Sequence, residues 1–272
     1  MKFTQSIASI TIVCSLLASS AVMAHGHEMK ETNGFDHSHR SEANQQRDEF
    51  RQPFRTLEFF GIEKDQKVVE IMPGGGWYSE ILAPMLKEKG QFVAAHHPSD
   101  SPSSYRKRSR AEYEEKLDGN ENIYGNVVMA NFAPKAGVDN ATRQADLVLT
   151  FRGLHGLQNS GDLAAAFGQF NQMLRPGGAL GIVQHQAPEG HDPIQTARLG
   201  YLPKSHVVAV AKAAGFDLVA EAYFHNNPKD TIIADGVSGG VWTLPPRLRT
   251  EEKEKYADVG ESNRMTLLFH KR

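Results

Sequence analysis

The stretch KVVEIMPGGG, from Lys67 to Gly76, decides the fold of this chain because it joins an apolar strand to a glycine-rich turn. Residues 67–72 (KVVEIM) are rich in apolar residues, which is typical of a strand that is buried on both faces. A helix is predicted directly after the turn, since Tyr78, Ile81 and Leu82 recur at helical spacing. Glycines let a ligand approach the backbone, and the positive end of a helix favours an anionic or polar group. The sequence therefore predicts a ligand site at the carboxyl end of this strand.

Strands and helices alternate along the rest of the chain. Further strands are predicted at Gln91–Ala95, Ile123–Met129, Asp146–Phe151, Ala179–Val183, Phe216–Ala222 and Met265–His270. Helices are predicted around 50–57, 78–86, 103–117, 163–174 and 207–214. This alternation indicates an α/β fold of the Rossmann-like kind, with a seven-stranded, mainly parallel sheet flanked by helices.

The composition is that of an ordinary soluble globular protein. The chain has 272 residues, 40% hydrophobic and 23% charged, which is enough for one large α/β domain. Its formal net charge of -2 gives no reason to expect binding to nucleic acid. The basic run Arg106–Arg110 suggests either an anion site or a solvated helix face, and the acids in 112–116 favour the solvated face.

The first 24 residues have the pattern of a secretory signal peptide. Lys2 is followed by the apolar run 7–17 and by small residues up to Ala24, where cleavage is predicted. The apolar run is short for a membrane-spanning helix, which needs about 20 residues, so stable membrane insertion after cleavage is not expected. The single cysteine, Cys14, lies in this segment, and the mature protein therefore has no thiol. These features predict a periplasmic or secreted protein.

The segment 25–46 is polar, shows no hydrophobic periodicity, and is predicted to be a disordered arm before a domain at 47–272. The arm contains His25, His27, His37 and His39. These imidazoles are able to bind zinc or copper. A solvated tail is favoured over a metal site, because a flexible arm has no surrounding groups to orient metal ligands.

Two nucleotide cofactors compete for the glycine turn. A dinucleotide site requires G-x-G-x-x-G, but Gly76 is followed by Trp77, Tyr78 and Ser79. The acidic residue that would bind the ribose at the end of the second strand is also replaced, by the pair His96-His97. Both differences count against a nicotinamide dehydrogenase.

The chain resembles the class I S-adenosylmethionine-dependent methyltransferases more closely. Glu70 stands at the acidic position of that family's loop, Gly74 and Gly76 stand at two of its glycine positions, and Met72 stands where the first glycine is usual. The stretches DLVL at 146–149 and LRPGG at 174–178 resemble the fourth strand and the turn before the fifth. The two strands after Gly215 resemble the family's C-terminal antiparallel pair.

A closer resemblance, from about residue 50 to 272, is to a bacterial group of exported predicted methyltransferases. The shared features are EIxPGGGWY at 70–78, EILAP at 80–84, ADLVLTFR at 145–152 followed by His155, and NPxD at 227–230. The resemblance implies methyl transfer from S-adenosylmethionine to an unidentified small molecule. The alternative is an exported non-catalytic protein that binds a small ligand or a metal on the same fold.

The resemblance also implies roles for individual residues on the cofactor side. Gly74, Gly75 and Gly76 would lie beside the amino-acid end of the cofactor, and Glu70 would orient the loop or the cofactor's ammonium group, or form a salt bridge within the sheet. His96 or His97 would bind a ribose hydroxyl. Asn131 would accept a hydrogen bond from the adenine, or would be a plain turn asparagine.

On the acceptor side, residues after the fourth and fifth strands are implicated. His155 would take a proton from the acceptor, with His185 on the same edge of the sheet. Arg152 would bind an acidic substrate bidentately. A structural hydrogen-bonding role is the alternative for each of the three. Asp230 would line the same rim or close a turn, and Tyr78 would pack in the core.

Overall fold

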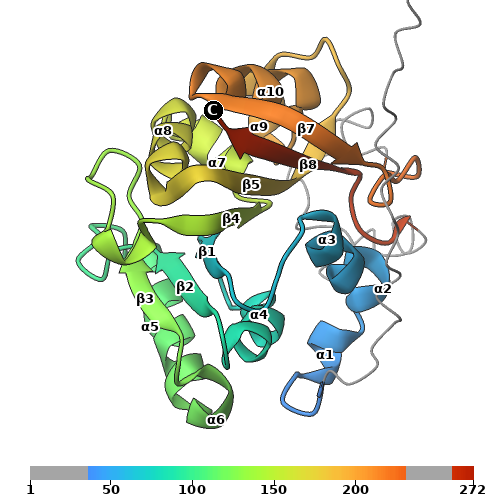
Figure 1. Cartoon of the computed structure of the whole chain (residues 1–272). Helices are drawn as coiled ribbons and strands as arrows, with labels where there is room; N and C mark the ends of the chain where they lie inside the picture. The colour runs from blue at the N-terminus through green and yellow to red at the C-terminus, as the bar shows by residue number, and fades with distance from the viewer. Residues whose placement is uncertain (1–35, 231–258) are drawn as a thin grey trace, which may run out of the picture.

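The computed structural model describes residues 36–230 and 259–272 (Figure 1). The predicted signal peptide and residues 25–35 of the predicted arm lie outside these ranges. Within the two ranges, none of the helices combines the length and the apolar character needed to cross a membrane.

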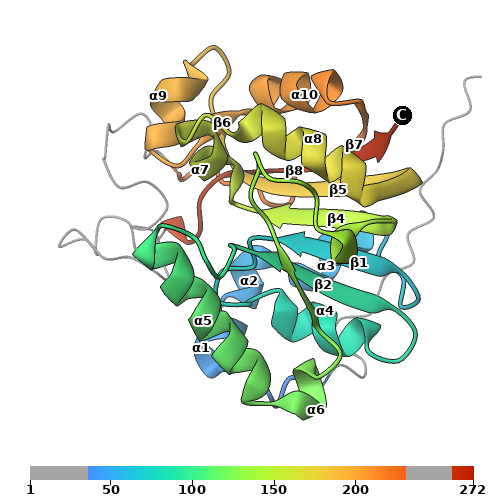
Figure 2. The ribbon, with the colours of Figure 1, turned by 90° about the vertical axis from the view of Figure 1, so that its left-hand side faces the viewer.

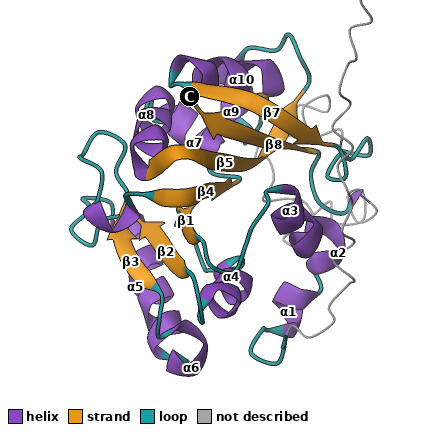
Figure 3. Ribbon diagram, viewed as in Figure 1, coloured by secondary structure: helices purple, strands orange, loops and turns teal. Residues whose placement is uncertain are grey.

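A single twisted sheet forms the centre of the domain (Figure 3). Its main strands run in the order β3-β2-β1-β4-β5-β8-β7, and the first five of these are parallel. The bounds are β1 Lys67–Ile71, β2 Gln91–His96, β3 Val128–Asn131, β4 Ala145–Phe151, β5 Leu174–Ala187, β7 Phe216–Ala222 and β8 Arg264–Lys271. The last strand is antiparallel to both β5 and β7. The predicted α/β fold and its C-terminal antiparallel pair are therefore confirmed, with one additional two-residue strand, β6 Leu202–Pro203, beside β5.

Helices cover both faces of the sheet (Figure 2). The helices are α1 Glu42–Gln45, α2 Asp48–Arg51, α3 Pro53–Phe59, α4 Ser79–Leu86, α5 Ser104–Asp118, α6 Glu121–Tyr124, α7 Leu154–Asn159, α8 Leu163–Met173, α9 Pro193–Arg198 and α10 Lys204–Ala213. Side chains of α7, α8 and α10 share one hydrophobic core with the sheet, and side chains of α3, α4 and α5 share the other.

The alternation of side chains along β1 explains why apolar residues occupy successive positions in this strand. Val68 packs into the core beneath α3, α4 and α5, whereas Val69 and Ile71 pack into the core beneath α7 and α8. All three side chains are buried. A parallel strand that is covered on both faces has no solvent side, and it therefore needs apolar residues at successive positions.

Three predicted elements differ from the structure. The stretch 174–178, expected to be the turn before the fifth strand, is the first part of β5. The strand predicted at 123–129 is wrong in its first half, because 121–124 form α6, which ends at Gly125, and β3 begins only at Val128. Tyr124 is buried against the α4 and α5 side of the sheet, so tertiary packing overrides the strand propensity of this stretch. The single helix predicted around 50–57 is divided at Gln52, whose left-handed conformation precedes Pro53.

The prediction of a disordered arm is wrong for residues 36–46, which pack on the domain. The Arg40 side chain is buried and binds Asp48 (Nη1 to Oδ2, 2.6 Å) and Glu80 (Nε to Oε2, 3.3 Å). Asn44 donates a further hydrogen bond to Glu80 at 2.8 Å. The segment is fixed by charge-assisted hydrogen bonds instead of an apolar stripe, and hydrophobic periodicity does not reveal such contacts.

Candidate active site

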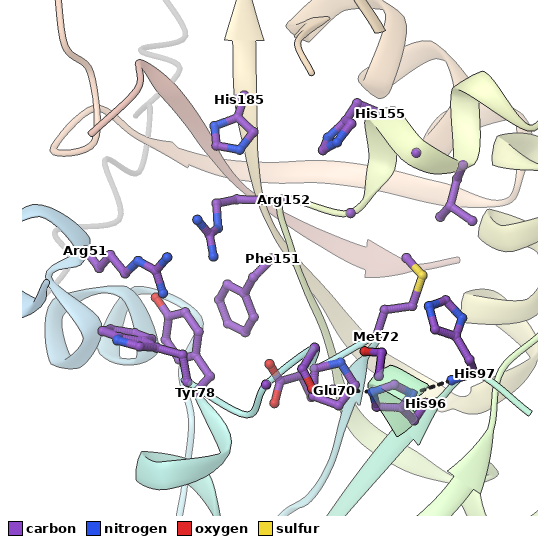
Figure 4. A pocket seen from close by; sticks show the side chains of 18 of the residues that line it. Arg51, Glu70, Met72, Tyr78, His96, His97, Phe151, Arg152, His155 and His185 are labelled. Atoms are coloured by element: carbon purple, nitrogen blue, oxygen red, sulfur yellow. Dashed lines mark hydrogen bonds between the residues drawn. The ribbon is translucent and has the colours of Figure 1, made fainter. Parts of the chain in front are cut away.

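A cavity of about 500 Å³ opens at the carboxyl ends of β1, β2, β4 and β5. Its volume falls in the range of about 300–1,000 Å³ that is usual for small-molecule sites. Seven of the predicted site residues line it, namely Glu70, Gly74, Gly75, His96, Arg152, His155 and His185. In Figure 4, Glu70, Met72, His96 and His97 lie on one side of the cavity, and Arg51, Arg152 and His185 lie on the other.

The three glycines of the loop have different structural requirements. Gly74 and Gly76 adopt positive φ angles of 60° and 75°, which side chains rarely tolerate. A Cβ atom at Gly76 would also lie 2.9 Å from the Tyr113 ring, and this glycine does not line the cavity. Gly75 has neither restriction, because its φ is not positive and a Cβ there would meet no atom within 4 Å. The absence of a side chain at Gly75 therefore leaves open space in the cavity and serves no packing need.

The two sides of the cavity each contain a non-glycine residue in the left-handed region. Met72 follows β1 with a φ of 50°, and Arg152 follows β4 with a φ of 60°. Such conformations cost about 1–3 kcal/mol and concentrate at functional sites. The φ of Met72 gives a physical reason for the glycine that is usual at this position of the family's loop.

Glu70 lies buried beneath the glycine loop. One carboxylate oxygen accepts a hydrogen bond from Ser79 Oγ at 3.2 Å, and Ser79 in turn accepts one from the Tyr113 hydroxyl at 2.9 Å. Burial raises the pKa of Glu70 to about 8, although Ser79 and the more distant Lys116 act in the opposite direction. At neutral pH the Glu70 side chain is therefore mostly a neutral acid. Within residues 36–230 and 259–272 it has no salt bridge, which was its alternative role.

His96 holds the glycine loop in place. Its Nδ1 accepts a hydrogen bond from the His97 backbone N–H at 2.8 Å, which leaves the proton of the neutral ring on Nε2, 3.4 Å from the carbonyl oxygen of Gly74. Burial lowers the pKa of both His96 and His97 to about 4, so both rings are neutral at pH 7. With both nitrogens of His96 occupied, His97 is the better placed of the two for a ligand hydroxyl.

Asn131, at the end of β3, lies outside the cavity. Its side-chain oxygen accepts a hydrogen bond from Arg110 Nη1 at 2.9 Å, and its backbone N–H donates to Asp139 at 2.9 Å. Arg110 comes from the basic run of α5 and also donates to the carbonyl of His97. In the same run, Arg108 is 63% exposed, as the solvated-face interpretation requires, whereas Arg106 lines the cavity.

The two histidines of the acceptor side face each other, with ring centroids 6.0 Å apart. The Gln184 side-chain oxygen accepts from the Leu154 N–H at 3.1 Å, so its nitrogen faces His155 Nδ1, at 3.4 Å. Nδ1 is then the acceptor, and the neutral His155 ring carries its proton on Nε2. Burial, and secondarily Arg152, lowers the pKa of His155 to about 4.

His185 is fully buried at the end of β5. Its Nδ1 lies 2.5 Å from Ser262 Oγ, and its buried Nε2 has no hydrogen-bond partner among the described residues. Burial lowers the pKa of His185 well below its usual value, and the nearby Arg152 and His155 add to this effect. If the ring donates to Ser262 from Nδ1, Nε2 carries the lone pair.

Arginine side chains surround Glu261 at this end of the cavity. Glu261 Oε1 binds Arg47 at 2.8 Å and Arg51 at 3.0 Å. Its Oε2 lies 3.3 Å from Arg264 and 3.9 Å from Arg152. These cations hold the pKa of Glu261 far below its usual value despite its burial. Arg47, Arg51 and Glu261 were not predicted from the sequence, because the first two lie in a short N-terminal helix region and the third lies far along the chain.

An aromatic wall connects the two sides. Tyr78 stacks on Phe151 with ring centroids 3.6 Å apart, and Trp77 packs edge-on against Tyr78 at 4.7 Å. Tyr78 is buried, as its helical position predicts, but it also lines the cavity together with Trp77 and Phe151. Trp77 lies in the PGGGWY motif and Phe151 in the TFR motif, so these motifs were the sequence features from which the two aromatic residues could have been predicted to lie at the site.

The NPxD motif fixes the segment that carries Glu261. Asn227 Nδ2 donates to the carbonyl oxygens of Val259 and Glu261, both at 2.6 Å. Asp230 accepts from the Asn263 N–H at 2.7 Å and from the Tyr201 hydroxyl at 2.8 Å. Asp230 does not line the cavity, so the motif positions cavity residues instead of contacting a ligand.

The described parts of the chain, 36–230 and 259–272, contain no group of three or more His, Cys, Asp or Glu side chains arranged to bind a metal ion. The predicted arm histidines His25 and His27 lie outside these ranges.

Comparison with known proteins places the chain among methyltransferase folds. No protein-family model matches it. It is 28% identical over 173 residues to the ubiquinone/menaquinone biosynthesis C-methyltransferase UbiE of Haemophilus ducreyi, a match that covers 61% of each protein. It is 26% identical over 183 residues to UbiE of a Shewanella species, covering 65% of this chain and 66% of that protein. The chain thus spans less than two thirds of the length of these relatives.

Solved structures are similar in fold at lower identity. An S-adenosylmethionine-dependent methyltransferase from Aquifex aeolicus has a TM-score of 0.55 and 16% identity, over 88% of this chain and 100% of the other. The [4+2]-cyclase SpnF has a TM-score of 0.54 and 15% identity, over 82% and 80%. Geranyl diphosphate methyltransferase, solved with S-adenosylmethionine, has a TM-score of 0.52 and 12% identity, over 82% and 86%. The fold is that of the S-adenosylmethionine-dependent methyltransferases, and SpnF shows that proteins of this fold also carry other names and reactions.

Proposed function

We propose that this chain is an S-adenosylmethionine-dependent methyltransferase that acts on a small molecule. The observation that carries the proposal is the open space above Gly75, in a cavity that also contains His155 and His185. The resemblance to UbiE and to the methyltransferase structures supports the same cofactor.

The residues on the glycine-loop side fit this cofactor. Gly74 and Gly75 line a surface without side chains, which suits close approach of the cofactor's amino-acid end. Glu70, mostly protonated, would accept or donate one hydrogen bond at the base of the loop. His97 would bind a ribose hydroxyl in place of the acid that many methyltransferases have at the end of the second strand.

The residues on the other side would orient the acceptor. When bound, S-adenosylmethionine supplies a methyl group whose bond to sulfur breaks, leaving the electron pair on sulfur, as the acceptor bonds to the carbon. The protein's contribution is mainly to align the acceptor's lone pair, by proximity and orientation. His155 would donate a hydrogen bond from Nε2, and the buried Nε2 of His185 would receive a proton that the acceptor loses.

Isothermal titration of the full chain with S-adenosylhomocysteine tests the cofactor assignment. We expect micromolar binding to the wild type and a loss of at least about tenfold in Gly75→Asp, because the new side chain would occupy the open space beside the loop. Gly137→Asp is the matched control, because Gly137 also has open space around it but does not line the cavity. Absence of binding at millimolar ligand, or equal binding by Gly75→Asp, would contradict the proposal.

We also propose that the protein is exported as a mature chain that begins at His25. The support is the order of charged, apolar and small residues in 1–24. Mass spectrometry of the purified protein after expression of the full gene measures the cleavage directly. Leu16→Arg interrupts the apolar run and should leave the chain uncleaved. An intact N-terminus on the wild-type protein would overturn the proposal.

A further inference from the structure

Among the described residues, positive charge exceeds negative charge at the acceptor end of the cavity. Four guanidinium groups, those of Arg47, Arg51, Arg152 and Arg264, lie within 4.0 Å of the single carboxylate of Glu261. Three of these cations are almost fully buried, and the Arg152 side chain is 27% exposed. A buried charge needs a partner, and among the described residues the three buried guanidinium groups of Arg47, Arg51 and Arg264 share the one carboxylate of Glu261.

The excess of positive charge is clearest at Arg51. Its side chain is 2% exposed, its Nε binds Glu261, and its Nη2 has no hydrogen-bond partner among the described residues. Burial lowers the pKa of Arg51, and Arg152 and the other guanidinium groups lower it further. A guanidinium nevertheless stays protonated in proteins, so the group is a buried cation with an unused donor at the cavity.

The other described residues that line the cavity add no negative charge at this end. Glu70 is mostly neutral at pH 7, and in Figure 4 it lies on the far side of Phe151 from Arg152. His155 and His185 are neutral as well, because burial and Arg152 lower the pKa of each. Arg106 adds a further cation to the lining.

We propose that the acceptor is an anionic small molecule whose carboxylate or phosphate binds between Arg51 and Arg152, with its apolar body against the aromatic wall of Trp77, Tyr78 and Phe151. This inference rests on the proposed methyltransferase function. Guanidinium groups bind acid groups through paired hydrogen bonds, which gives orientation as well as affinity. The bound acid would also offset the repulsion from Arg152, which adds to the effect of burial on the pKa of His185, and would thereby make this imidazole a better proton acceptor.

The cofactor's own carboxylate is the competing source of negative charge. Arg152 follows β4 and lies next to His155 and His185, on the side of the cavity opposite the glycine loop (Figure 4). This placement favours the acceptor, and the two sources make different predictions when the cofactor site is filled.

Titrations with benzoate and benzamide test the inference, because the two probes share a ring and differ in charge. We expect the full chain to bind benzoate at least about tenfold more tightly than benzamide, as a charge-assisted pair allows, with or without saturating S-adenosylhomocysteine. In Arg51→Gln and Arg152→Gln the preference should disappear. Arg108→Gln, at an exposed position of α5, should keep it. Phenyl phosphate in the same series distinguishes a phosphate from a carboxylate ligand.

Each result of these titrations has a definite meaning. Equal affinity for benzoate and benzamide, or no benzoate binding at millimolar concentration, overturns the inference. Loss of benzoate binding once S-adenosylhomocysteine is bound assigns the arginines to the cofactor and also overturns it. Retained preference for benzoate without any S-adenosylhomocysteine binding would support the anion site and refute the proposed function. If Arg51→Gln does not fold, the more exposed Arg152 still provides the test.

Discussion

The glycine-loop side of the cavity comes from one continuous stretch, 70–76, with His96 from the next strand, whereas the arginine side comes from four separate segments. Arg51, Arg152, His185 and Glu261 belong to the N-terminal helices, the end of β4, the end of β5 and the segment before β8. On the first side, Glu70 and His96 are mostly neutral at pH 7, and the loop depends on backbone shape. The second depends on charges that balance only when the whole chain has folded. The two sides should therefore respond differently to substitution.

The largest effect is expected at Glu261, which binds the arginines together. Glu261→Gln leaves buried guanidinium groups without a counter-charge and should reduce the free energy of unfolding by about 3–5 kcal/mol. Urea denaturation followed by circular dichroism measures the loss. Glu112→Gln, at a 68% exposed side chain, should change it by less than about 0.5 kcal/mol. A loss below about 1 kcal/mol for Glu261→Gln would show that the cluster does not depend on this carboxylate.

A smaller loss of stability is expected at Asn227, which holds the segment that carries Glu261. Asn227→Asp keeps the size of the side chain but removes the donor to the carbonyls of Val259 and Glu261. Two acceptors without partners should cost about 1–3 kcal/mol in the free energy of unfolding. Asn126→Asp removes one donor to the exposed Lys87 carbonyl and serves as the control. Equal effects of the two substitutions would mean that the NPxD motif does not position Glu261.

On the glycine-loop side, the pH dependence of stability reports the burial of Glu70. The folded protein keeps this proton up to about pH 8, whereas the unfolded chain loses it near pH 4.5. Between these values the folded state binds more protons, so the free energy of unfolding falls as the pH rises. From pH 7 to 9 the wild type should lose roughly 1.4 kcal/mol more than Glu70→Gln, which does not titrate.

Urea denaturation at pH 7, 8 and 9 measures this difference, with Glu112→Gln as the control that should follow the wild type. The buried histidines do not interfere, because their lowered pKa values place their contribution below about pH 6.5. Parallel curves for the wild type and Glu70→Gln would show that Glu70 is ionised in the folded protein at pH 7.

The difference between the glycine-loop side and the arginine side also explains which features could be predicted from the sequence and which could not. The loop at 70–76 and the mainly parallel sheet were predictable, because apolar runs and glycines act locally along the chain. The antiparallel pair at the C-terminal end was expected from the resemblance to the methyltransferase family. The sequence also indicated Arg152, His155 and His185, since residues that follow parallel strands meet at one edge of the sheet. Structure alone revealed that His96 holds the loop and that Asn131 binds Arg110 outside the cavity.

The charge cluster could not be predicted, because it joins three parts of the chain that are more than 100 residues apart. Arg51 and Glu261 are separated by 210 positions, and neither lies in a strand or in a glycine turn. The sequence also failed to predict that residues 36–46 pack on the domain, and the reason is related. The anchor of this segment, Arg40, is a charged side chain buried against Asp48 and Glu80, and a polar segment that is fixed by ion pairs has the same composition as a disordered one.

The smallest effect concerns Met72, where the backbone itself is the distinguishing feature of the glycine-loop side. Met72→Gly and Met72→Ala both remove the side chain and differ in a single Cβ atom, which is disfavoured at a φ of 50°. The glycine variant should therefore be more stable than the alanine variant by about 1 kcal/mol, measured by urea denaturation. Met129 in β3 is also partly buried but has an ordinary φ, so alanine should be the more stable replacement there. The same order of stability at both positions would mean that the loop does not hold Met72 in the left-handed region.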